Sequence, residues 1–149
     1  MKKALFPGTF DPFTIGHADI VERALPLFDH IVIGIGVNEE KTPADAAEKR
    51  AETIRNIYKD EPRVSVLVYD GLTVDTCQRE GIDFLLRGVR SMRDFEYERD
   101  VAAANKQLAG IETILLFSNE RLAHISSSLV RELKKYGRDV SEFLPKTMI

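Results

Sequence analysis

The chain has 149 residues, of which 44% are hydrophobic and 30% charged, and its formal net charge at pH 7 is −3. This composition is typical of a globular protein that can bury a core, and we expect one domain over residues 1–149. The acidic balance argues against broad nucleic-acid binding, and the absence of a signal-peptide pattern or membrane-length apolar run predicts a cytoplasmic protein with no membrane partner.

The first part of the chain predicts a strand, a loop and a helix. An apolar run over residues 3–6 indicates a short strand, and the prolines and glycines between residues 7 and 16 indicate a loop. Apolar residues then recur at the spacing of one buried helix face, so we expect a helix over about residues 16–28. His17 lies at its N-terminus, where unpaired N–H groups and the helix dipole favour an anion.

Strands and helices alternate through the rest of the chain. Runs of β-branched and apolar residues predict further strands over residues 30–37, 63–69, 83–86 and 113–117. Helical periodicity predicts helices over residues 44–58, 72–80, 94–108 and 126–137. This order predicts an α/β fold with a five-stranded, parallel, doubly wound (Rossmann-like) sheet. The fourth strand is expected to stop before a turn in which Arg87 and Arg90 flank Gly88.

Conspicuous polar residues follow the predicted strands. Because ligands bind at the carboxyl ends of such strands, these residues should converge on one edge of the sheet. They are Thr9 and His17 after the first strand, Lys41 after the second, Arg87 and Arg90 after the fourth, and Ser126, Ser127 and Ser128 after the fifth.

This set of side chains favours charge stabilisation over covalent catalysis. Ser127 and Ser128 lack the Gly-x-Ser-x-Gly elbow of a serine nucleophile, and no carboxylate partner for His17 can be identified. Phosphoryl or nucleotidyl transfer requires positioning and neutralisation of charge on phosphate oxygens. If the attacking group is a phosphate, it is already largely ionised at neutral pH, so no general base is needed. For His124, loop packing and ligand contact are equally plausible.

Three segments resemble a known family. Residues 7–12 and the sequence Thr14-Ile15-Gly16-His17 match the T/HxGH nucleotidyltransferase superfamily. Residues 87–90 followed by 94–98 are much more specific to one family, and the segment 125–132 resembles the last nucleotide-binding segment of that family. Over nearly its whole length the chain therefore resembles the bacterial phosphopantetheine adenylyltransferase family, which implies a nucleotidyltransferase-type fold.

The resemblance implies a reaction and a quaternary structure. The adenylyl group of ATP, used with Mg²⁺, would pass to 4′-phosphopantetheine and give 3′-dephospho-coenzyme A and pyrophosphate. The pantetheine phosphate would attack in line, without a covalent enzyme intermediate. No protein residue is predicted to bind metal, because the triphosphate and water can hold Mg²⁺. The family also implies a homohexamer.

The resemblance also assigns residues to roles. At the reacting phosphates, His17 would stabilise the transition state, Thr9 would orient the attacking phosphate, and Lys41 and Arg90 would complete the catalytic set. Further contacts to the acceptor would come from Leu72, Thr73 and Arg87, in addition to Thr9 and Lys41. Thr73 stands where a larger apolar residue is expected. The ATP site would comprise Thr9, Phe10, His17, Gly88, Val89, Arg90, Glu98, Leu122, Ala123, His124, Ile125, Ser126, Ser127 and Ser128.

Two alternatives stay open at this point. The chain could be another member of the superfamily that adenylylates nicotinamide mononucleotide or cytidylylates glycerol phosphate. It could also be a non-catalytic module that senses ATP or coenzyme A. The block over residues 87–98 weighs against the first, and the presence of both His17 and Lys41 weighs against the second, because a pure binder needs no group for a transition state.

Overall fold

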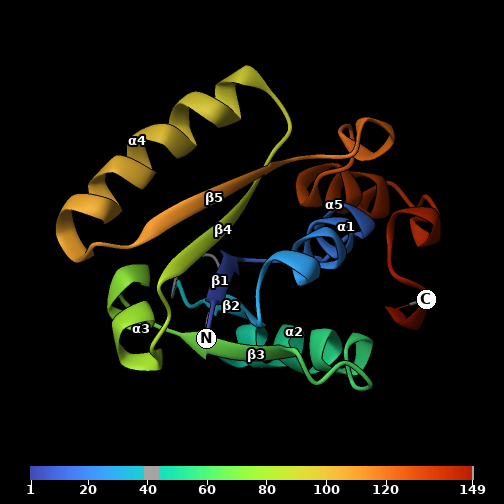
Figure 1. Cartoon of the computed structure of the whole chain (residues 1–149). Helices are drawn as coiled ribbons and strands as arrows, with labels where there is room; N and C mark the ends of the chain where they lie inside the picture. Colours follow the sequence, from blue (N-terminus) through green and yellow to red (C-terminus); the bar gives the residue numbers. More distant parts are fainter. Residues whose placement is uncertain (39–43, 149) are drawn as a thin grey trace.

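The computed structural model describes residues 1–38 and 44–148 of the chain (Figure 1). The strands are β1 (Lys3–Gly8), β2 (His30–Gly36), β3 (Val64–Tyr69), β4 (Phe84–Val89) and β5 (Glu112–Phe117). The α-helices are α1 (Ile15–Ala24), α2 (Ala44–Ile57), α3 (Thr73–Glu80), α4 (Met92–Ala109) and α5 (Ser127–Lys135). Short 3₁₀ turns are formed by η1 (Leu25–Leu27), η2 (Glu120–Leu122), η3 (Ser141–Phe143) and η4 (Lys146–Met148).

The five strands form one parallel sheet in the order β3-β2-β1-β4-β5. The chain winds from β1 outward through β2 to β3 and then returns to the other side of β1 with β4. The strand order therefore reverses between β1 and β4, and such a reversal opens a ligand crevice at the carboxyl ends of the two strands. This topology confirms the predicted α/β doubly wound sheet.

Two hydrophobic cores cover the two faces of the sheet, because successive side chains of a strand point to opposite faces. Phe6 and Ile33 pack in the core that contains the apolar faces of α1 and α2. Leu5 and Val32 pack in the other core, with residues of α3 that include Cys77. Burial raises the pKa of the Cys77 thiol to about 11, which agrees with an inert packing role.

The prediction that Arg87 and Gly88 form a turn after the fourth strand is wrong, because β4 continues to Val89. Arg87 pairs with Leu115 of β5, and Gly88 with the next residue of that strand. A Cβ atom on Gly88 would lie 3.2 Å from Cγ1 of Ile20, so the glycine lets α1 pack closely against the strand. Arg87 therefore sits on rigid backbone, and only Arg90 lies beyond the strand.

The C-terminal segment returns to the body of the molecule. After α5 the chain forms the short turns η3 and η4, and Met148 packs against the core that α1 and α2 cover. Within residues 1–38 and 44–148, every helix is too short or too polar to span a lipid bilayer.

Candidate active site

Two neighbouring cavities lie at the carboxyl ends of β1 and β4. The first, which we call the α1 cavity, has a volume of about 410 Å³ and lies among the loop after β1, the start of α1, the end of β4 and the start of α5. The second, the α4 cavity, has a volume of about 330 Å³ and lies among the ends of β2 and β3 and one side of α4. The two share a wall formed by Pro7, Gly8, Thr9, Arg87 and Glu98.

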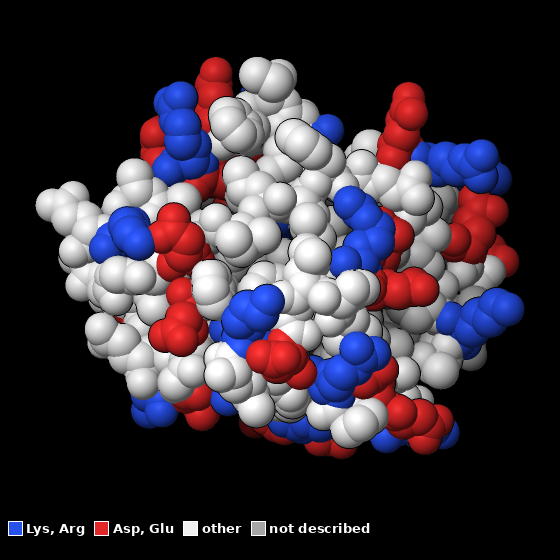
Figure 2. Space-filling model, in the orientation of Figure 1, with Lys and Arg blue, Asp and Glu red and all other residues white. Residues whose placement is uncertain are grey.

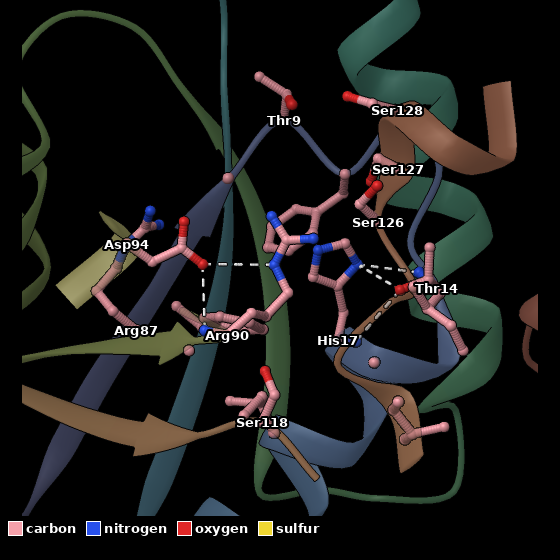
Figure 3. Close-up of a pocket in the computed structure, with 18 of the residues that line it drawn as sticks. Thr9, Thr14, His17, Arg87, Arg90, Asp94, Ser118, Ser126, Ser127 and Ser128 are labelled. Carbon is pink, nitrogen blue, oxygen red and sulfur yellow. Dashed lines mark hydrogen bonds and ion pairs between the residues drawn. The ribbon is translucent and has the colours of Figure 1, made fainter. Parts of the chain in front are cut away.

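The first turn of α1 fixes the imidazole of His17. Thr14 is the N-cap residue, and its hydroxyl oxygen accepts the backbone N–H of His17 at 3.4 Å. In return, the backbone N–H of Thr14 donates to Nδ1 of His17 at 2.9 Å (Figure 3). This is a capping box with histidine in place of the usual glutamate or glutamine. Because Nδ1 accepts an N–H, the proton of the neutral ring is on Nε2, the nitrogen that faces the cavity on the side of Arg90 in Figure 3.

The surroundings of His17 keep its imidazole neutral. The ring packs against Phe10 and Phe13, with centroid separations of 5.0 and 5.4 Å. Burial, together with the positive charges of Arg90 and Arg87, lowers its pKa to about 4. At neutral pH His17 therefore offers a directed Nε2–H hydrogen-bond donor and contributes no net charge to the site.

Phe10 supports the histidine from inside the protein. It lines the α1 cavity, but only 4% of its surface is exposed and its ring also packs against Phe6. Its φ of 50° is a backbone conformation that residues other than glycine rarely adopt. With the ring buried, contact with a ligand is left to the Phe10 backbone.

Arg90 lines the α1 cavity and is more exposed than Arg87. Its backbone N–H donates to Oδ2 of Asp94 at 3.1 Å, and its Nε lies 3.5 Å from the same oxygen (Figure 3). With 43% of the side chain exposed, this pairing is weakly stabilising, and the guanidinium can turn toward a bound anion. Asp94 was not predicted as a cavity residue, although its i,i+4 spacing from Arg90 gave a signal for the pair.

The serine hydroxyls at the start of α5 make contacts within the protein. The N-cap Ser126 accepts the backbone N–H of Leu129, and Ser127 donates to the carbonyl oxygen of Pro12 at 2.7 Å. Ser128 accepts a hydrogen bond from Arg131 at 3.1 Å. Because these three serines line the α1 cavity, the backbone N–H groups at the very start of α5 lie beside it, and such groups suit a phosphate.

Arg131 adds a third guanidinium to the α1 cavity. Its Nη1 donates to the carbonyl oxygen of Asp11 at 2.7 Å and so ties α5 to the loop after β1. On the face drawn in Figure 2, basic and acidic side chains are interspersed over the surface. The grouping of arginines and two helix N-termini around the α1 cavity is thus a local feature suited to a small polyanion.

Arg87 and Glu98 form an ion pair in the wall between the cavities. Arg87 Nε donates to Glu98 Oε2 at 2.9 Å, and Nη2 donates to Oε1 at 2.8 Å. Nη1 of the same guanidinium donates to the carbonyl oxygen of Pro7 at 2.7 Å. The pair holds Arg87 in one orientation beside Thr9.

The α4 cavity is lined largely by apolar and neutral polar groups. Its apolar surface comes from residues such as Val101 and Ala102, and Asn105 adds an amide. The hydroxyls of Tyr69 and Thr73 lie 2.9 Å apart in a hydrogen bond. This lining suits an uncharged chain that carries a few polar groups.

The structure brings most of the predicted site residues together. Those that line the α1 cavity are Thr9, Phe10, His17, Arg87, Gly88, Arg90, Glu98, Leu122, Ile125, Ser126, Ser127 and Ser128. Thr73 lines the α4 cavity. Four predicted residues line neither cavity: Leu72, which is 61% exposed, Val89, which is buried, Ala123 and His124. Lys41 lies outside the described residues.

No group of three or more His, Cys, Asp or Glu side chains placed to bind a metal ion occurs in residues 1–38 and 44–148. The two carboxylates that line the α1 cavity, Asp94 and Glu98, are each paired with an arginine. A divalent cation in this cavity would therefore take its oxygen ligands mainly from bound phosphates and water.

Comparisons with known proteins agree with this geometry. A sequence model described as cytidylyltransferase-like matches residues 5–133. The phosphopantetheine adenylyltransferase of Bacteroides thetaiotaomicron is 55% identical over 148 residues, which cover 99% of this chain and 98% of that protein. The protein of the same name from Porphyromonas gingivalis is 53% identical over 151 residues, covering 100% of this chain and 99% of the relative.

Solved structures show the same fold. A bifunctional NMN adenylyltransferase/ADP ribose pyrophosphatase from Francisella tularensis superposes with a TM-score of 0.72 at 13% identity. A second structure of that enzyme, complexed with AMP and a manganese ion, gives a TM-score of 0.69 at 12% identity. Each match covers 96% of this chain but only 44% of the larger enzyme. Together with the sequence relatives, these findings show that the chain belongs to the cytidylyltransferase-like family and, within it, to the phosphopantetheine adenylyltransferases.

Proposed function

We propose that the chain transfers the adenylyl group of ATP to 4′-phosphopantetheine, giving 3′-dephospho-coenzyme A and pyrophosphate. The observation that carries this proposal is the pair of cavities with a common wall. The α1 cavity, with its arginines and helix N-termini, suits a triphosphate, and the α4 cavity suits the amide-containing pantetheine arm. The names of the sequence relatives support the same substrates.

In this proposal the bond changes occur at the α-phosphorus of ATP. An oxygen of the acceptor phosphate forms a new bond to that phosphorus, and the bond to the α,β-bridging oxygen breaks. Pyrophosphate leaves with the electron pair. The attacking oxygen already carries negative charge at neutral pH, so no side chain has to remove a proton.

The side chains of the site would act by positioning and by stabilising charge. The Nε2–H of His17 would donate to an oxygen of the transition state, where charge is spread over the phosphoryl oxygens. Arg90 and the N-terminus of α5 would hold the phosphates of ATP, and Arg87 and Thr9 would hold the acceptor phosphate. The family resemblance adds Lys41 as a further cation at the reacting phosphates.

The proposal includes Mg²⁺ bound to ATP. The ion would neutralise charge on the triphosphate, and its ligands would be phosphate oxygens and water. The same resemblance leads us to propose a cytoplasmic homohexamer. Light scattering of the purified protein should then give about six times the 16.8 kDa mass of the chain.

Pyrophosphate release tests the function directly. The protein would be incubated with ATP and Mg²⁺ and with 4′-phosphopantetheine, nicotinamide mononucleotide or glycerol phosphate as acceptor. Of these three acceptors, we expect only 4′-phosphopantetheine to give pyrophosphate release. Release with a different acceptor would keep the chemistry and change the substrate. Tight ATP binding without release for any acceptor would indicate a nucleotide sensor instead.

A further inference from the structure

Glu98 occupies an unusual position for a carboxylate. The structure describes every residue of α4, and Glu98 is the one buried residue among them, with 6% of its surface exposed. Burying a carboxylate is costly unless a cation and hydrogen bonds compensate. An 18-residue helix whose one buried residue is charged indicates that this carboxylate has a specific task.

The contacts of Glu98 point to Arg87. Both carboxylate oxygens accept from the guanidinium, Oε2 from Nε at 2.9 Å and Oε1 from Nη2 at 2.8 Å, which is a side-on bidentate pair. Nη1 donates to the carbonyl oxygen of Pro7 at 2.7 Å. Of the five N–H donors of a guanidinium, three are thus used and two remain, one on each terminal nitrogen. Both remaining donors belong to a cationic group and can form charge-assisted hydrogen bonds to a phosphate.

The location of the pair determines which phosphate these two donors can reach. Arg87, Glu98 and Thr9 line both cavities, so they lie at the boundary between them. If ATP binds in the α1 cavity and the pantetheine arm binds in the α4 cavity, the acceptor phosphate has to lie at this boundary to reach ATP. A carboxylate without its arginine would repel that phosphate, whereas the neutral pair presents only the remaining N–H donors.

We propose that Glu98 is a positioning residue for the acceptor, which acts by holding the Arg87 guanidinium toward the acceptor phosphate. This proposal rests on the proposed function. It gives Glu98 a task on the acceptor side of the site, in addition to the contact with ATP that the family resemblance implies. In this arrangement, Glu98 affects acceptor binding through the orientation of Arg87.

Binding measurements on three ligands test this proposal. Calorimetry would measure the affinities of Mg²⁺-ATP, 4′-phosphopantetheine and pantetheine. Pantetheine has the same arm as 4′-phosphopantetheine but lacks the phosphate. The proteins compared would be the wild-type chain, Glu98→Ala and Glu98→Gln. For Glu98→Ala we expect an affinity loss of about 10- to 100-fold for 4′-phosphopantetheine, because a charge-assisted contact is no longer aligned. The affinity for pantetheine should stay within about twofold, and any change in the affinity for Mg²⁺-ATP should be smaller than the loss for 4′-phosphopantetheine. Glu98→Gln should show a smaller loss, because the amide oxygen can still accept from one N–H.

A matched control and a second variant keep the outcome clear. Glu96→Ala makes the same change at an exposed position of the same helix and should leave all three affinities unchanged. In an Arg87→Lys background, where the side-on pair cannot form, Glu98→Ala should cause no further loss for 4′-phosphopantetheine. Glu98→Gln, which keeps the size of the side chain, gives an answer if Glu98→Ala is poorly folded.

Several results would overturn the proposal. A loss confined to Mg²⁺-ATP would mean that Glu98 serves the nucleotide. Equal losses for pantetheine and 4′-phosphopantetheine would mean that it only shapes the cavity. Failure of the wild-type chain to bind 4′-phosphopantetheine would reject the proposed function itself, and that result is distinct because it appears before any substitution is made.

Discussion

The two cavities share a wall but differ in chemistry. The α1 cavity is surrounded by arginines, by the Nε2–H of His17 and by the first turns of two helices. Among the described residues that line the α4 cavity, the charged ones are Arg87 and Glu98, and these pair with each other. One cavity is therefore built to stabilise changing charge, and the other to hold an uncharged chain.

This difference separates two kinds of functional effect. Groups that interact more strongly with the transition state than with the substrates determine kcat, whereas groups that contact the unreacting arm determine the affinity for the acceptor. Substitutions in the α1 cavity should therefore act on turnover. Substitutions in the shared wall and in the α4 cavity should instead act on the affinity for the acceptor.

The largest effect is expected for His17→Ala. Loss of a directed donor to the phosphoryl oxygens should lower kcat by about 100-fold or more, and the Kd of ATP should change little. Steady-state pyrophosphate release and ATP calorimetry would measure the two quantities. His30→Ala is the control, because His30 pairs with Ser65 away from both cavities. A loss of ATP affinity as large as the loss of kcat would make His17 a ground-state contact.

Arg87→Ala should act on the shared wall. We expect the affinity for 4′-phosphopantetheine to fall by about 10- to 100-fold, the usual range for a hydrogen-bonded contact between charged groups. The Kd of Mg²⁺-ATP should change much less. Arg93 is exposed, so Arg93→Ala serves as the control and should change neither value. If ATP binding alone weakens, the assignment of Arg87 to the acceptor is wrong.

The low pKa of His17 predicts an acid-dependent loss of stability. Between about pH 4 and 6.5 the unfolded chain binds a proton at His17 that the folded chain does not, so stability falls as the pH falls. From pH 7.5 to pH 5 this group should cost about 2 kcal/mol of unfolding free energy. Urea unfolding of the wild-type chain and of His17→Gln at both pH values would isolate it. Equal pH dependence in the two proteins would show that the imidazole is not held neutral.

The smallest effect is expected for Thr73→Val, which keeps the shape of the side chain and removes its hydrogen bond to Tyr69. One such bond is worth about 1 kcal/mol, so the KM for 4′-phosphopantetheine should rise about two- to fivefold. The kcat should stay unchanged. Thr53→Val on α2, whose hydroxyl donates to a backbone carbonyl within that helix, is the control. A fall in kcat with an unchanged KM would contradict the separation of the two cavities.

Much of the fold and part of the site could be predicted from local sequence patterns. Hydrophobic periodicity and the glycines and prolines between elements were sufficient for the strand and helix order. The end of β4 was predicted wrongly, because Arg87-Gly88 has turn-like residues but is held in the strand by pairing with β5. Such pairing depends on residues nearly 30 positions away and is invisible in a local window.

The site shows the same limit. Thr14 and Asp94 had local signals, since one begins a capping box and the other lies four residues after Arg90. Arg131, which lines the α1 cavity, had a weaker local signal in its spacing from Ser128. The buried pairing of Glu98 with Arg87 had none, because it follows from the tertiary packing of α4 against β4.

The capping box of α1 has a spectroscopic consequence. The amide proton of Thr14 points at Nδ1 of His17, so its chemical environment depends on that one ring. Protonation of the imidazole, or a ligand that draws on its Nε2–H, would change the acceptor strength of Nδ1. A single backbone resonance in an ¹⁵N spectrum can thus report the electronic state of the imidazole while the enzyme binds its ligands.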